Sequence, residues 1–149
     1  MPPALRHTDT DMPGDARRSG SANAPRGRDG VAPAGWPAAV PPPGVPGWER
    51  PAVAWLFDLC PPDFRVYQVL RAHPLVLARV AREHVAAGID ACRAGLSSVR
   101  ADLRDVVAAE VVEAAVGMYE REGARLTGLA REIELVGQAL RGHRFVPRL

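Results

Sequence analysis

The chain has 149 residues, with 15 prolines and 14 glycines, and its formal net charge is +2. Every Lys/Arg position is arginine, and the acidic residues almost balance them. Nucleic-acid-binding proteins usually concentrate a marked basic excess on one element, so this balance disfavours that class. No run of about 18 apolar residues occurs, and a transmembrane helix is therefore not expected.

Two features indicate a cytoplasmic protein. The N-terminal stretch is polar and broken by proline, and it lacks the apolar core of a secretory signal. Cys60 and Cys92 lie in different segments, and in the absence of such a signal both are expected to be free thiols. We therefore predict no membrane association and no disulfide framework.

Residues 1–47 are predicted to be a disordered tail. They contain 10 of the 15 prolines and half of the glycines, and no apolar periodicity runs through them. Such a composition buries too little apolar surface to offset the entropy of ordering. On this interpretation the packed domain is residues 48–149, with Trp36 solvated and Trp55 buried. An alternative is that part of the tail precedes the true start, with Met12 as a later start site.

Residues 48–72 are predicted to form an aromatic-rich strap that docks on the rest of the domain. The strap holds two of the three tryptophans and two of the three phenylalanines, and large aromatics this close together usually pack onto a core. The stretch "AVAWLFDL" fits either a short strand or a helical turn, and Pro61-Pro62 ends it. Asp63 is expected to cap a short helix that continues to Val69.

Two long helical patterns follow the strap. The first helix is expected over residues 74–104, because Pro74 suits a first helical position. The second is expected over residues 106–141 with Asp105 as its cap, and residues 142–149 form a C-terminal tail. In both helices apolar residues recur in steps of three and four, the spacing of a coiled-coil seam. The first series is Val85, Ile89, Cys92, Leu96, Val99 and Leu103, and the second is Val112, Val116, Tyr119, Gly123, Leu126, Ala130, Ile133, Gly137 and Leu140.

The register of the two series favours an antiparallel two-helix hairpin in an all-α fold. Continuing the first series without a break would place Glu110, Glu113 and Gly117 on the apolar stripe, which is a poor core. A turn near residues 104–109 removes this conflict. Gly142 is expected to end the second helix in the left-handed conformation. A single long helix in an extended coiled coil is the alternative.

Small residues recur in both helices and are predicted to form a seam at which the two backbones approach closely. Gly88 and Gly95 would otherwise each weaken their helix by about 1 kcal/mol relative to alanine. The pairs that face each other in this register are Gly95 with Gly123, Gly88 with Ala130, and Ala81 with Gly137. A competing register sets small residues against large ones, with Gly88 facing Leu126.

No motif for chemistry emerges from the sequence. His73 and His84 match metal-ligand spacing only loosely, and the Glu-x-x-His signature of di-metal bundles is missing from both helices. Ser97 and Ser98 have no histidine one turn away to activate them. Cys60 precedes a proline, but a two-residue match carries little information. We therefore predict no catalytic residue, no metal ligand and no cofactor.

The apolar stripe of each long helix is wider than one neighbouring helix can cover. The sequence therefore favours a non-catalytic protein–protein interaction or scaffold module that acts through this stripe, with a second copy or a helical protein as partner. The alternative is a nucleic-acid-associated accessory factor that uses the arginines of helix 74–104. A third interpretation is a subunit that completes an enzyme built from another chain.

Overall fold

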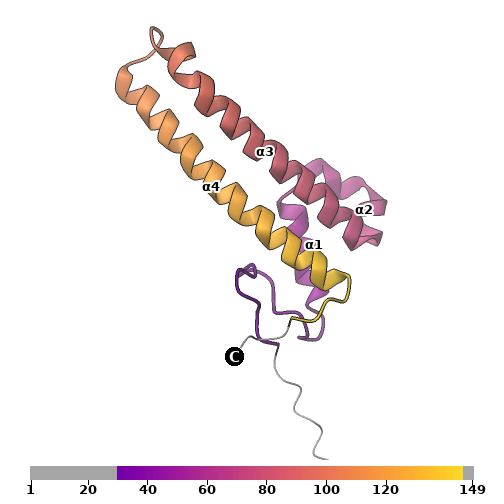
Figure 1. Ribbon diagram of the computed structural model, residues 1–149. Helices are drawn as coiled ribbons and strands as arrows, with labels where there is room; N and C mark the ends of the chain where they lie inside the picture. Colours follow the sequence, from indigo (N-terminus) through magenta and orange to yellow (C-terminus); the bar gives the residue numbers. More distant parts are fainter. Residues whose placement is uncertain (1–29, 146–149) are drawn as a thin grey trace, which may run out of the picture.

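The computed structural model describes residues 30–145, and the parts of the predicted tails at 1–29 and 146–149 lie outside the described residues. The described part contains helices and turns and no strand, which confirms the all-α prediction (Figure 1). The elements in chain order are α1 (Glu49–Asp58), the 3₁₀ helix η1 (Pro62–Val66), α2 (Gln68–Ala72), α3 (Pro74–Leu103) and α4 (Ala109–Leu140). Among these helices, none combines the length and the apolar character needed to cross a bilayer.

The long helices α3 and α4 lie side by side in opposite directions, joined by a short turn (Figure 1). Ion pairs link them near both ends, from Arg100 to Glu113 at 3.0 Å and from Arg82 to Glu134 at 3.6 Å. The turn occupies residues 104–108, within the range expected for it, but α4 begins at Ala109 rather than at 106. Asp105 was expected to cap α4, but the N-cap position is Ala108 and no side chain bonds to the helix end.

α4 ends in the left-handed glycine cap that the sequence predicts. Gly142 adopts a left-handed φ of 84°, and its amide donates to the carbonyl of Ala139 at 2.8 Å. The amide of His143 donates to the carbonyl of Gln138 at 3.0 Å. These bonds satisfy carbonyl groups that a helix end leaves without partners.

The strap consists of α1, η1 and α2 joined by short turns, and its first part is a helix rather than a strand. In α1 the side chains of Ala52, Leu56 and Phe57 are buried, and they join the core at the base of the α3–α4 pair. Asp63 lies inside η1 and caps no helix, so its predicted role is wrong. The pair α3–α4 projects beyond this base, and α1 covers only the half that lies far from the turn (Figure 1).

Residues 30–47 were predicted to be part of a disordered tail, and the structure overturns this for that stretch. Val40 is only 3% exposed and belongs to the core cluster. Trp36 is half-buried rather than solvated, with its ring 5.7 Å from that of Trp48 and its Nε1 donating to the carbonyl of Val40 at 2.8 Å. The stretch folds as successive turns, so the burial of these side chains leaves no periodic signal in the sequence.

The register of α3 against α4 corrects the predicted seam of small residues. A Cβ added at Gly88 would meet Leu126 Cδ1 at 3.0 Å, and one added at Gly95 would overlap the ring of Tyr119. Gly123 faces Cys92 rather than Gly95. The competing register, in which small residues face large ones, is therefore the one that forms. Two large side chains fill space better than two glycines would, because dispersion needs atoms in contact.

Two valines in the N-terminal stretch give a matched test of its packing. Val40→Ala removes buried methyl groups, and we expect it to lower the free energy of unfolding by about 2 kcal/mol. Val31→Ala is the control, because Val31 is 68% exposed and its substitution leaves the free energy nearly unchanged. Urea denaturation of the two variants measures the difference. Equal values for both variants would show that the stretch does not pack.

The glycines of the two long helices should respond differently to alanine. Gly128→Ala is expected to stabilise by about 1 kcal/mol, since nothing lies within 4 Å of the added Cβ. Gly95→Ala displaces the Tyr119 ring, and the overpacking outweighs the gain in helix propensity by about 1 kcal/mol. Thermal unfolding followed by circular dichroism gives both values. If Gly95→Ala stabilises as much as Gly128→Ala, the packing of Tyr119 against Gly95 is wrong.

Candidate functional site

The residues considered for chemistry in the sequence are not brought together by the fold. In residues 30–145 no three His, Cys, Asp or Glu side chains form a group that could hold a metal ion. His84 is exposed on α3, and Ser97 donates its hydroxyl hydrogen to the carbonyl of Ala94 at 2.7 Å. Ser97 is therefore engaged with its own helix instead of facing a base.

Cys60 and Cys92 are both free and buried. Burial raises the pKa of the Cys60 thiol, and the positive charge of Arg65 only partly offsets this effect. A thiol with a raised pKa holds little of the thiolate that acts as a nucleophile. Cys60 therefore behaves as a small apolar side chain, and it belongs to the main core cluster.

All four arginines of α3 are engaged in ion pairs. The pairs are Arg79 with Glu83, Arg82 with Glu134, Arg93 with Asp90, and Arg100 with Glu113. Both Nε and Nη2 of Arg100 donate to the Glu113 carboxylate at 3.0 Å, and these bonds lower the pKa of Glu113. Exposed pairs add little stability, but they reduce the positive charge that a phosphate backbone would meet.

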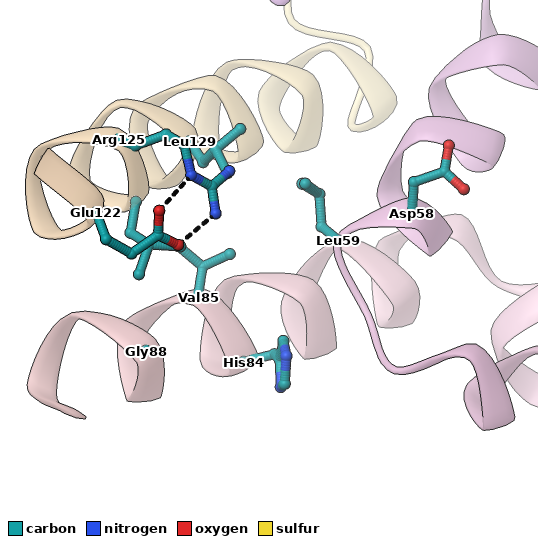
Figure 2. A pocket seen from close by; sticks show the side chains of 9 residues that line it. Asp58, Leu59, His84, Val85, Gly88, Glu122, Arg125 and Leu129 are labelled. Carbon is teal, nitrogen blue, oxygen red and sulfur yellow. Dashed lines mark hydrogen bonds and ion pairs between the residues drawn. The ribbon is translucent and has the colours of Figure 1, made fainter. Parts of the chain in front are cut away.

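A groove of about 300 Å³ opens where α1 ends over the α3–α4 pair. Figure 2 shows Leu59 reaching in from the end of α1 and Val85 and Leu129 from the two long helices. Gly88 lies in the floor, where Leu126 occupies the space beside it. The groove is half open, and its lining combines apolar side chains with charged ones at the rim.

The charged side chains at the rim of the groove are engaged in ion pairs. Arg125 binds Glu122 through two hydrogen bonds of 2.8 and 2.6 Å, which Figure 2 marks with dashed lines. These bonds lower the pKa of Glu122. Asp58, at the other side of the groove, pairs with Arg65. No charged group is left aimed into the groove as a substrate anchor would be, so the site offers shape and apolar surface.

The face of the hairpin that α1 covers continues past this groove toward the turn. Eighteen residues make five helical turns, so positions with that spacing point to the same side of a helix. On α4, Val111 and Met118 stand in this relation to Leu129 and Val136, which pack in the core. On α3, Gly95 and Ser98 stand in it to the core residues Leu77 and Val80. The Tyr119 ring fills the space beside Gly95, so we call the surface formed by Ser98, Val111 and Met118 the distal face.

The distal face is apolar and open to solvent on its α4 side. Val111 is 52% exposed and Met118 is 44% exposed, whereas Val136 is fully buried and Leu129 is partly buried. On its α3 side the face is bordered by Ser98, whose side chain is small and partly buried. Sequence reasoning identified an apolar stripe but did not include Val111 and Met118, although their spacing from Leu129 and Val136 was available as a signal.

A second exposed apolar patch lies at the base, around η1, α2 and the start of α3. Its members are Val66, Tyr67, Val69, Leu75 and Val76. These side chains come from η1, α2 and the start of α3 and the residues between them, and none of them lines the groove at the end of α1.

Comparison with known proteins adds no assignment to these surfaces. The chain matches no family model, no curated protein and no solved structure. The distal face and the groove beside it are therefore interpreted from their own geometry.

The accessibility of the two thiols provides a direct test of their place in the core. We expect Cys60 and Cys92 to react with a water-soluble disulfide reagent roughly tenfold or more slowly in the folded chain than in urea. Ser97→Cys supplies the control, because residue 97 is exposed on α3 and its thiol should react without delay. Reaction of Cys60 at the rate of that added thiol would contradict its burial.

Proposed function

We propose that the protein is a non-catalytic interaction module that binds a helical protein through the apolar stripe of its α3–α4 hairpin. The observation that carries the proposal is the exposure of Val111 and Met118, at 52% and 44%, on the face that α1 covers elsewhere. Apolar side chains gathered on one helix face mark protein interaction sites. The coiled-coil character of the hairpin belongs to the same proposal, as does a cytoplasmic setting, which the two free thiols support.

The nucleic-acid alternative finds less support in the charges. All four arginines of α3 are in ion pairs with carboxylates. Arg104, next to the turn, is in no ion pair within the described part of the chain. A phosphate-binding surface needs several arginines free on one face, and this helix does not present them.

Site-specific photo-crosslinking in cells tests the proposed function. A benzophenone amino acid at position 118 is expected to form a covalent adduct with one defined protein, which mass spectrometry identifies. The matched control carries the same amino acid at position 120, two residues or about 200° around α4, where Glu120 is exposed on the opposite side. Equal labelling from both positions, or no adduct from position 118, would argue against an interaction through this face.

A further inference from the structure

Residues 30–47 pack on the base of the helical part, beside the start of α1 and the end of α4 (Figure 1). We propose that they form a latch that opens as a unit on a hinge at Gly47 while the helices stay folded. Opening uncovers an apolar surface that the latch otherwise hides. The inference goes beyond the proposed function, because it concerns the base of the molecule rather than the distal face.

The hydrogen bonds of the latch are formed within it. The amide of Trp36 donates to the carbonyl of Pro33 at 3.0 Å, and the amide of Val40 donates to the carbonyl of Pro37 at 3.1 Å. Trp36 is the only residue of the latch whose side chain can donate a hydrogen bond, and its Nε1 donates to the carbonyl of Val40. These turns can therefore persist when the latch leaves the base.

No polar interaction fastens the latch to the end of the hairpin. Residues 30–47 include no charged residue, so they form no ion pair through their side chains. Within residues 30–145, no backbone hydrogen bond runs from the latch to α4. Undocking from α4 therefore breaks no backbone hydrogen bond, and the free energy of docking comes from apolar contact.

A small set of apolar side chains provides that contact. Pro37 is fully buried, and Val40 is 3% exposed. The Trp36 ring makes edge-to-face contacts with Trp48 at the start of α1 and with Phe145 beyond the end of α4. A segment with so few buried side chains opens at a lower free energy than the helices of a core do.

The surface beneath the latch is apolar. Besides the rings of Trp48 and Phe145, it includes Leu135 of α4, because a Cβ added at Gly35 would lie 3.7 Å from Leu135 Cδ1. An exposed surface that combines aromatic and aliphatic side chains is typical of interaction sites. The position of the latch therefore decides whether this surface can be reached from solvent.

Gly47 has the properties of a hinge. Its φ is 78°, and a Cβ added to it would meet nothing within 4 Å, so the chain is free to rotate there. It lies just before α1, at the kind of position where hinges absorb changes in φ and ψ. Rotation about this φ leaves the Gly47 carbonyl bonded to the amide of Arg50 and breaks the bond from the Trp48 amide to the Val45 carbonyl.

The core of the helical part does not depend on the latch. Its fully buried side chains include Leu56 of α1, Leu77 of α3 and Ile133 of α4. The helices α3 and α4 also contact each other directly along their length. The hairpin and α1 therefore keep their packing when residues 30–47 move away.

Thiol labelling at position 40 measures the opening. Val40→Cys keeps a small apolar side chain at the buried site, and a water-soluble reagent reaches it when the latch opens. Peptide mass spectrometry separates this site from Cys92 in the same molecule. We expect position 40 to react at least tenfold faster than Cys92, but more slowly than Val31→Cys, whose site is 68% exposed. Reaction as fast as that of Val31→Cys would overturn the proposal, because the latch would then not dock.

Two glycine variants, each combined with Val40→Cys, show which part of the molecule opens. Gly47→Ala disfavours the left-handed hinge of the docked latch and should speed labelling at position 40 roughly tenfold. Gly128→Ala stabilises α4 whether the latch is docked or open. It should therefore slow labelling of Cys92 about fivefold and leave position 40 unchanged.

Two outcomes of this comparison contradict the latch. If Gly128→Ala slows position 40 as much as Cys92, residues 30–47 open only when the hairpin unfolds. If Gly47→Ala leaves the rate at position 40 unchanged, the hinge does not lie at Gly47. Neither outcome bears on photo-crosslinking from position 118, so the latch and the proposed function are tested separately.

Discussion

Leu126 and Tyr119 of α4 fill the space that Gly88 and Gly95 leave open on α3, and the shape of the molecule depends on this contact. Each glycine has no side chain at the position where a large side chain of α4 packs against α3. The two helices can therefore lie close together along a long contact. The helix propensity lost at the glycines is offset by dispersion against the large side chains. Nearer the turn, Val99, Val112 and Val116 are buried as well, although α1 covers only the opposite half of the hairpin (Figure 1).

The uneven coverage of the hairpin links the fold to its proposed role. At the base, α1, α2 and the turns of residues 30–47 gather around the long helices and bury most of the core cluster. Toward the turn the same side of the hairpin carries Val111 and Met118 with no element of residues 30–145 over them. A stable base and a projecting apolar face are the properties that a module needs if it presents a rigid surface to a partner helix.

The aromatic contacts at the base tie both ends of the described chain to this scaffold. The centroid of the Trp36 ring lies 5.7 Å from that of Trp48 and 6.2 Å from that of Phe145, and both contacts are edge-to-face. One residue thus connects the N-terminal turns, the start of α1 and the segment after α4. Such edge-to-face contacts favour specific ring orientations, so they fix how the irregular segment enters the helical part.

The sequence by itself determined the all-α class, the apolar steps along both long helices, and the left-handed cap at Gly142, because helix periodicity and capping are local properties. Only the tertiary structure decided which residues face each other. Pairings of Gly88 with Ala130 or with Leu126 are equally regular along the chain, and the choice depends on how completely side chains fill the space between the helices. The burial of Val40 could not be predicted from the sequence either, since consecutive turns produce no periodic pattern of apolar residues. The exposure of Met118 was decided by where α1 ends over the hairpin, which no local pattern encodes.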